Sequence, residues 1–182
     1  MRYGAFLRGI NVGKHKRVRM EDLRSAFSLL GFSRVETYIQ SGNVFFDTPE
    51  KNLPQMTAVI QEALQKLIGG EVPVFIRSLV ALNEILRQDP FRVVKSSDES
   101  KRFICFLSHE IKDKIRLPLF SPNKDVEIIA IRGADLFGLI HPYKGRSGYP
   151  GNFIEAALDV RMTTRFWETL QKMITAQNAT AV

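Results

Sequence analysis

The order of apolar patterns over residues 1–77 constrains the fold of this chain more than any other feature of its 182 residues. Short β-compatible runs and longer stretches with helical periodicity follow one another as strand, helix, strand, strand, helix, strand. Thr48 is the expected N-cap of the second helix, with Pro49 at its first position. The expected elements are a strand at 3–10, a helix over 20–30, strands at 35–40 and 44–47, a helix over 49–68 and a strand at 72–77.

This order matches a ferredoxin-like βαββαβ arrangement. We therefore predict an α+β fold with a ferredoxin-like subdomain over residues 1–77, followed by a second α+β subdomain over residues 78–182 that ends in two helices. The elements expected in the second subdomain are short helices at 79–86 and 110–116, a strand at 102–107, a hairpin of 125–131 and 136–140, a glycine-rich loop at 144–152, and helices at 153–160 and 164–174.

The predicted sheet brings two polar loops to the same end. The loop 9–14 follows the first strand, and the turn 40–43 joins the second strand to the third. Because the third strand lies between the first and second, and neighbouring strands are about 4.8 Å apart, the two loops should be separated by roughly 10 Å. Their side-chain amides, hydroxyl and cations suit an anionic or phosphate-bearing ligand. The alternative is that the glycines merely permit tight turns.

The net charge of +7 arises almost entirely at the N-terminus. Residues 1–20 contain six basic residues and no acidic one, whereas the other 162 contain 20 basic and 19 acidic residues, a net charge of +1. The basic run 14–19 could gain affinity for nucleic-acid phosphates by releasing counterions, or could be a solvated loop. The aromatic rings on the predicted strands are expected to form core rather than a surface on which bases stack; they are Tyr3, Phe6, Phe45 and Phe46.

Several kinds of site are not predicted. The single Cys105 rules out an internal disulfide, and three widely separated histidines provide no metal-ligand cluster, so we expect no metal and no cofactor. Cys105 lies in an apolar strand, where its thiol should be buried with a raised pKa. We expect none of the three histidines to be catalytic, and His109 is expected to open a helix. The sequence therefore identifies no catalytic residue and leaves open whether the protein is an enzyme.

Two glycine-containing segments could hold phosphate. Gly9 and Gly13 with Lys14 approximate a P-loop, but the spacing is one residue short and His15 replaces the required Ser or Thr, which excludes nucleotide hydrolysis by that route. The loop 145–151, flanked by Lys144 and containing Arg146, is either an anion-binding nest or a flexible surface loop. No run approaches the ~20 apolar residues that a membrane span needs, so we expect no membrane partner. The single cysteine fits a reducing, cytoplasmic location.

Three segments carry a resemblance to a known family. Residues 6–13 (FLRGINVG), 38–44 (YIQSGNV) and 163–167 (TTRFW) resemble the signature segments of a widespread bacterial family catalogued as a domain of unknown function. The resemblance implies a two-part α+β protein with no established activity, cofactor or catalytic residue. The family pattern usually has Asn where this chain has Phe166. The third segment adds Thr164 and Arg165 as candidates, because they are expected at a helix start, where free N–H groups favour anions.

The leading hypothesis is a cytoplasmic protein that binds a phosphate-bearing ligand, either a nucleotide or a nucleic acid. One alternative is an enzyme acting on a small anionic metabolite in a cleft between the two halves; another is an oligomeric module joined at sheet edges. The sequence does not specify the oligomeric state. The residues expected to bind the ligand are Arg8, Asn11, Lys14, Arg17, Gln40, Ser41, Asn43, Arg146, Thr164 and Arg165.

Overall fold

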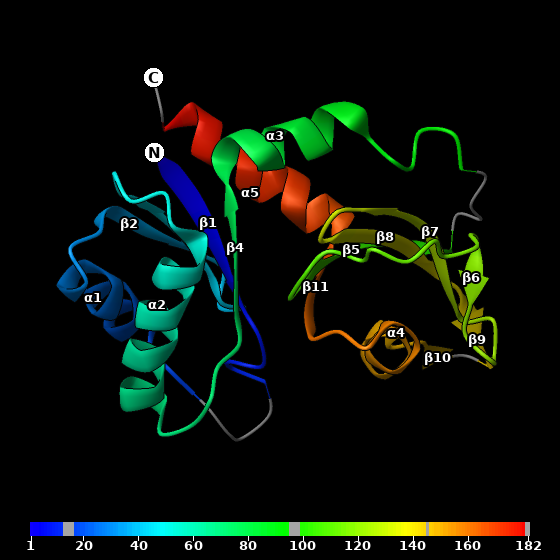
Figure 1. Cartoon of the computed structure of the whole chain (residues 1–182), viewed down its shortest axis with the longest axis horizontal. Helices are drawn as coiled ribbons and strands as arrows, with labels where there is room; N and C mark the ends of the chain where they lie inside the picture. Colours follow the sequence, from blue (N-terminus) through cyan, green and yellow to red (C-terminus); the bar gives the residue numbers. More distant parts are fainter. Residues whose placement is uncertain (13–16, 95–98, 145, 181–182) are drawn as a thin grey trace. The chain divides into compact units, whose positions relative to one another are not determined.

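The computed structural model describes residues 1–12, 17–94, 99–144 and 146–180. The chain divides into two compact units, Met1–Glu84 and Ile85–Val182, each with its own antiparallel sheet (Figure 1). Together the helices and sheets form an α+β protein, as predicted from the order of the apolar patterns.

The first unit contains a four-stranded sheet with two helices on one face (Figure 1). Its strand order is β2-β3-β1-β4, and all neighbouring strands are antiparallel. Strand β3 therefore separates two strands that run parallel, β1 and β2, which is the order that a ferredoxin-like subdomain requires. Its elements are β1 (Arg2–Leu7), α1 (Met20–Leu29), β2 (Ser33–Tyr38), β3 (Asn43–Asp47), α2 (Leu53–Ile68) and β4 (Val74–Ser78). Helix α3 (Leu79–Gln88) contains the division between the units.

The core of the first unit forms where α1 and α2 cover the sheet. Leu23 and Phe27 of α1 and Ile60 of α2 are almost fully buried, in agreement with the helical spacing of their apolar residues. Phe46 of β3 stacks on Phe32 with the ring centroids 4.4 Å apart. The four aromatic residues expected in the core are each at most 3% exposed, which confirms that prediction; they are Tyr3, Phe6, Phe45 and Phe46.

Two predicted boundaries in this unit differ from the structure by three or four residues. Strand β1 ends at Leu7 rather than at residue 10, because Gly9 and Asn11 have left-handed backbones, with φ of 69° and 56°. Helix α2 begins at Leu53 rather than at Pro49. Its N-cap is Asn52, whose side chain accepts a hydrogen bond from the Gln55 N–H at 3.1 Å.

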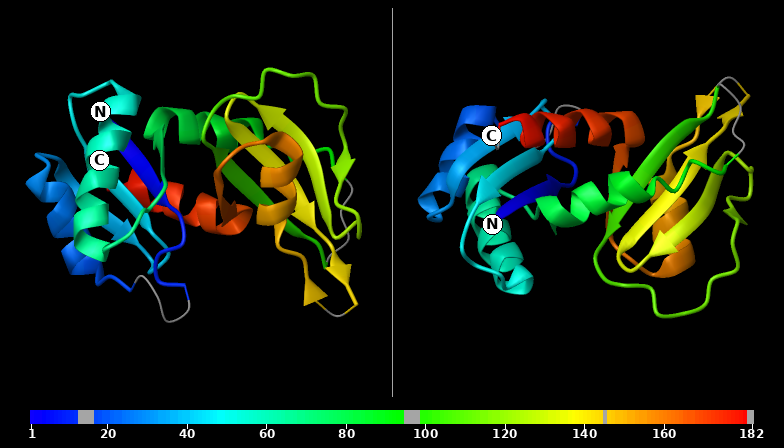
Figure 2. Two further views of the ribbon diagram at one scale, coloured as in Figure 1. Left: turned by 60° about the horizontal axis from the view of Figure 1, so that its bottom comes forward. Right: turned by 90° about the horizontal axis from the view of Figure 1, so that it is seen from above.

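The second unit contains a five-stranded antiparallel sheet with the order β11-β5-β8-β7-β6, and a separate pair formed by β9 and β10. Helix α4 lies on one face of the five-stranded sheet (Figure 2). Its Ile154 packs with residues of β5 and β8 in one apolar cluster. The elements of this unit are β5 (Lys101–Leu107), β6 (Leu119–Phe120), β7 (Val126–Arg132), β8 (Asp135–Ile140), β9 (Pro142–Tyr143), β10 (Arg146–Ser147), α4 (Pro150–Leu158), β11 (Met162–Phe166) and α5 (Trp167–Ala179).

Two predictions in the second unit are wrong. Residues 110–116, together with His109, form no helix; instead the Ile111 N–H donates to the Gly133 carbonyl at 3.4 Å and its side chain packs on the core. Thr164 and Arg165 do not begin a helix. They lie in β11, which pairs with β5, and α5 starts at Trp167. The β-branched threonines fit this sheet position, and pairing with β5 outweighs the helical pattern that follows them.

Candidate functional site

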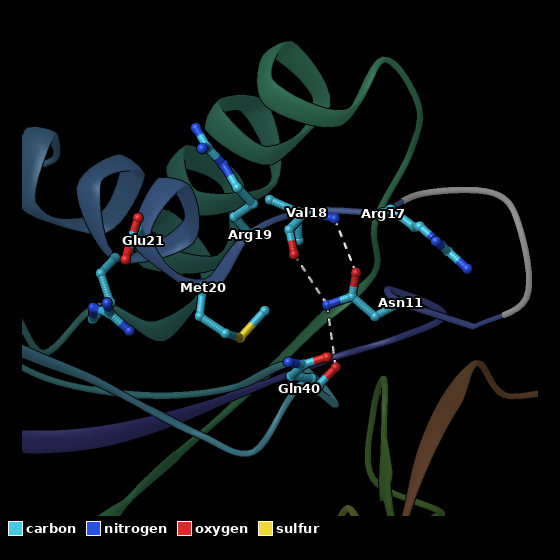
Figure 3. Close-up of a pocket in the computed structure, with 8 residues that line it drawn as sticks. Asn11, Arg17, Val18, Arg19, Met20, Glu21 and Gln40 are labelled. Carbon is cyan, nitrogen blue, oxygen red and sulfur yellow. Dashed lines mark hydrogen bonds between the residues drawn. The ribbon is translucent and has the colours of Figure 1, made fainter.

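Asn11 connects three segments at one end of the first sheet. Its Nδ2 donates to the carbonyls of Val18 and Gln40, each at 3.2 Å, and its Oδ1 accepts the Val18 N–H at 2.9 Å (Figure 3). Both N–H bonds of the amide are therefore used inside the protein. Asn11 shapes the site by joining the loop after β1, the segment before α1 and the turn after β2.

The turn between β2 and β3 is held closed in a similar way. Asn43 is buried, and its Nδ2 donates to the Tyr38 carbonyl at 3.2 Å and to Ser41 Oγ at 2.9 Å. Gly42, with a φ of 73°, packs so tightly that an added Cβ would lie 2.9 Å from Leu7 Cβ. The Leu7 N–H also donates to the Gly42 carbonyl at 2.8 Å. The expected gap of roughly 10 Å between the two loops is thus wrong, because the loops contact each other directly.

An open pocket of about 680 Å³ adjoins the Asn11 connection, between the N-terminus of α1 and the β2-β3 turn. Three of its lining residues are arginines and one is acidic, so the lining has a net positive charge. The lining residues are Asn11, Arg17, Val18, Arg19, Met20, Glu21, Arg24 and Gln40. Of the residues expected to bind the ligand, the structure brings together Asn11, Arg17 and Gln40 here.

The three arginines differ in how firmly they are held. Arg24 is half-buried, and its Nη1 donates to Thr37 Oγ1 of β2 at 2.9 Å. Arg19 forms two hydrogen bonds to Asp22, at 2.9 and 3.1 Å, which lower the pKa of that carboxyl and raise the pKa of Arg19. Arg17 and Arg19 are exposed and extend outward (Figure 3). Arg24 is therefore the best-positioned cation of the pocket, and the charge of Arg19 is partly balanced by Asp22.

The N-terminus of α1 adds positive potential. Its N-cap residue, Arg19, makes no side-chain capping hydrogen bond, and Met20 and Glu21 of the first turn line the pocket. The first N–H groups of a helix have no partner within the helix, and the helix dipole favours an anion beside them. The arrangement can therefore supply guanidinium and backbone donors to one anionic group.

The other residues expected to bind the ligand lie elsewhere. Lys14 and the side chain of Arg146 lie outside the described residues. The Arg8 N–H donates to the Pro73 carbonyl at 3.0 Å. Thr164 Oγ1 lies 3.3 Å from Cys105 Sγ, and Arg165 is 8% exposed. Neither of the last two residues lines the pocket.

Arg165 is held inside the second unit. Its Nη1 donates to Thr163 Oγ1 at 2.9 Å and to the Thr164 carbonyl at 2.8 Å. Burial lowers its pKa to about 10. Thr164 and Arg165 therefore offer an anion no free N–H groups of a helix start, because both lie in β11.

Sequence reasoning missed Arg19, Met20, Glu21 and Arg24 as lining residues. One signal was present, because Met20 and Arg24 are four residues apart in a predicted helix and thus share a face. The contribution of Thr37 depends on how β2 passes α1, which no local pattern specifies. The predicted start of the helix at Met20 was the signal that could have identified Arg24, which lies one turn further along.

The predicted environment of Cys105 is confirmed. Its side chain is fully buried, and burial raises the pKa of the thiol to about 12. Within the described part of the chain, no three His, Cys, Asp or Glu side chains are grouped so that they could hold a metal ion. Nor does any helix among these residues combine the length and apolar character needed to cross a membrane.

Comparisons with known proteins identify relatives but no activity. The family model described as "Protein of unknown function (DUF1697)" matches residues 1–137. No curated protein matches the chain. Among solved structures, the chain is similar to the conserved bacterial protein SP0830 from Streptococcus pneumoniae, with a TM-score of 0.65 and 19% sequence identity. That match covers 96% of this chain and 97% of the other, and at this identity it supports the fold alone.

Proposed function

The chain belongs to the DUF1697 family of proteins of unknown function, and we propose that it binds a phosphate-bearing small ligand in the pocket beside α1. The observation that carries this proposal is the grouping of Arg17, Arg19 and Arg24 around the N-terminus of a ten-residue helix. The pocket volume, about 680 Å³, is in the range usual for small-molecule sites. A nucleotide is the ligand class we expect.

The chemistry of the lining favours phosphate. A guanidinium presents planar donors that match two phosphate oxygens at once. Thr37 already orients Arg24, so less side-chain entropy is lost when a ligand binds. The exposed Arg17 lines the same pocket and adds a second guanidinium to it. Together with the backbone donors of α1, these groups can neutralise a doubly charged phosphate.

A small ligand is favoured over a nucleic acid. Single-stranded nucleic acids bind largely by stacking bases on exposed aromatic rings. Phe6 and Phe45 of the first sheet are buried and Tyr38 is half-buried, and no aromatic residue lines the pocket. The positive charge is thus available without a stacking surface, which suits a ligand recognised through its phosphate group.

Binding is favoured over catalysis at this pocket. An enzyme acting on a small anionic metabolite would use Asn11 and Asn43 to orient the substrate or stabilise an oxyanion. The N–H groups of both amides instead donate to atoms of the protein. We retain the cytoplasm as the proposed location, on the basis of the single cysteine in the sequence.

Calorimetric titration with inorganic phosphate, pyrophosphate and ATP tests the proposal. We expect Arg24→Gln to weaken binding at least about tenfold, because a hydrogen bond to a charged group contributes roughly 1.5–3 kcal/mol. Affinity should also fall as the salt concentration rises.

Lys66→Gln is the matched control, since it removes one cation of the same unit from an exposed position outside the pocket. It should leave the affinity unchanged. Failure of all three phosphates to bind at millimolar concentration would refute the proposal, as would equal effects of the two substitutions. Binding of RNA or DNA alone would instead support the nucleic-acid alternative.

A further inference from the structure

We propose that Ser100 is a nucleophile activated by His141 and Glu127, and that the second unit therefore reacts with carboxylic esters. Ser100 Oγ lies 2.9 Å from His141 Nδ1, and His141 Nε2 lies 2.8 Å from Glu127 Oε2. A hydroxyl, an imidazole and a carboxylate thus form one continuous hydrogen-bonded chain. This site shares no residue with the pocket beside α1 and does not depend on the function proposed for it.

The register of the second sheet explains why these three residues meet. Strand β8 lies between β5 and β7, with Ile140 opposite Lys101 and Leu139 opposite Glu127. Ser100 immediately precedes β5 and His141 immediately follows β8, so continuing the register places them opposite each other. The His141 N–H also donates to the Asp125 carbonyl at 2.8 Å, which fixes the backbone at the end of β8.

The proton positions follow from the partners of the imidazole. A carboxylate can only accept, so the bond to Glu127 assigns a proton to His141 Nε2. In the neutral ring Nδ1 then carries the lone pair and accepts the Ser100 hydroxyl proton. His141 is thus oriented as a general base towards Ser100, and Glu127 is the residue that positions it.

The group is accessible to solvent. The side chains of His141 and Glu127 are 27% and 18% exposed, and Ser100 is half-buried. An ester can therefore approach from solvent at the ends of the strands. The nearby carboxylate can stabilise the imidazolium that forms during the reaction.

The reaction balances with water as the only co-reactant. Ser100 Oγ bonds to the acyl carbon while its proton moves to His141 Nδ1. The bond between that carbon and the leaving alkoxide then breaks, and the alkoxide takes the proton from Nδ1 and departs as an alcohol. The oxygen of water then bonds to the acyl carbon while one of its protons moves to His141 Nδ1. The bond between the acyl carbon and Ser100 Oγ breaks, Oγ takes that proton, and a carboxylic acid is released.

The chain offers a matched control in Ser108 and His109. Ser108 Oγ lies 3.0 Å from His109 Nδ1, but both residues are exposed. Among the described residues, no carboxylate pairs with His109. This pair thus has the contact between hydroxyl and imidazole without the positioning carboxylate. If that contact alone produced reactivity, Ser108 should react as fast as Ser100.

Labelling with an alkyl fluorophosphonate tests the proposal on the full-length protein. The serine oxygen bonds to phosphorus and fluoride leaves, so intact mass spectrometry detects one added phosphonyl group and peptide mapping locates it. We expect labelling at Ser100, its loss in Ser100→Ala, and at least a hundredfold slower labelling in His141→Gln. Glu127→Gln should slow labelling at least tenfold, and Ser108→Ala should label like the unaltered protein.

Circular dichroism and the unfolding midpoint of each variant separate loss of reactivity from loss of folding. Release of p-nitrophenol from p-nitrophenyl acetate gives an independent measure of acyl transfer and should follow the same order of variants. Absence of labelling in the folded, unaltered protein would overturn the proposal. Equal labelling rates in folded His141→Gln and the unaltered protein would overturn it as well.

Discussion

Asn11 and Gly42 show how single residues shape the pocket beside α1. Both have left-handed backbones, a conformation open to Gly at no steric cost and to Asn more readily than to most other residues. Gly42 allows the turn to lie against Leu7, and Asn11 uses its whole amide to connect neighbouring segments. The polar residues of the two loops were predicted to face a ligand. The structure shows instead that hydrogen bonds within the protein hold the loops in place, and that these bonds use polar groups of Asn11, Ser41 and Asn43.

Two substitutions of Asn11 should separate the contribution of its hydrogen bonds to stability from that of its left-handed backbone. Asn11→Gly keeps the left-handed backbone and removes three hydrogen bonds, so we expect it to lower the free energy of unfolding by about 2 kcal/mol. Asn11→Ala should cost about 1 kcal/mol more, because Ala disfavours that backbone conformation. Urea unfolding measures both values. If Asn11→Gly were as stable as the unaltered protein, the hydrogen bonds would not be needed to hold the loops.

At the scale of elements, the residue at which a helix begins determines where its side chains and its N-cap lie. Helix α1 begins at Met20, as predicted, and this places Arg24 one turn inside the helix, within reach of Thr37 on β2. Helix α2 begins four residues later than predicted. Thr48 has the side chain of an N-cap, but its Oγ1 accepts the Glu50 N–H in a local turn, while Asn52 caps the helix.

Two substitutions should distinguish the caps. Asn52→Ala should lower the free energy of unfolding by about 1 kcal/mol and speed hydrogen exchange at the Gln55 amide, because that amide loses its partner. Thr48→Val should leave exchange at Gln55 unchanged. Exchange measured by NMR on the two variants checks this result. If exchange at Gln55 were faster in Thr48→Val but not in Asn52→Ala, Thr48 rather than Asn52 would be the N-cap of α2.

At the scale of the whole molecule, the excess positive charge and the proposed nucleophile lie in different units. The excess positive charge lies in residues 1–20, within the first unit, whereas Ser100, Glu127 and His141 all belong to the second. A broadly basic protein would suggest a polymer partner, but a local cluster suits one anionic group. The two proposed activities therefore draw on different side chains.

This separation predicts independent effects of substitution. Arg24→Gln should leave the rate of phosphonate labelling at Ser100 unchanged, and Ser100→Ala should leave phosphate affinity unchanged, because neither site contains a residue of the other. The Arg24→Gln, Ser100→Ala double variant should show both single effects added together. Calorimetry and labelling on the three variants measure this. Any change in labelling with Arg24→Gln, or in affinity with Ser100→Ala, would reveal coupling.

Much of the fold could be predicted because it depends on local pattern. The spacing of Leu23 and Phe27 specifies a helix, and the β-compatible runs on either side of the β2-β3 turn specify a hairpin. The location of the pocket was also partly predictable, since strand order places Asn11 and Gln40 at one end of the sheet. The strand at Thr164 was not, because pairing with Cys105 of β5 outweighs local propensity.

The sequence alone therefore determined the element order, the aromatic core and the concentration of charge near one end of the chain, because these follow from periodicity and composition. Only the tertiary structure decided which polar groups remain available to a ligand. It showed that the amide of Asn11 is hydrogen-bonded within the protein and that Thr37 orients Arg24. It also showed that Ser100 contacts His141, 41 residues away, and that His141 in turn contacts Glu127. The physical reason is that hydrogen-bond partners are fixed by strand register and helix packing, which bring together residues that are distant in the sequence.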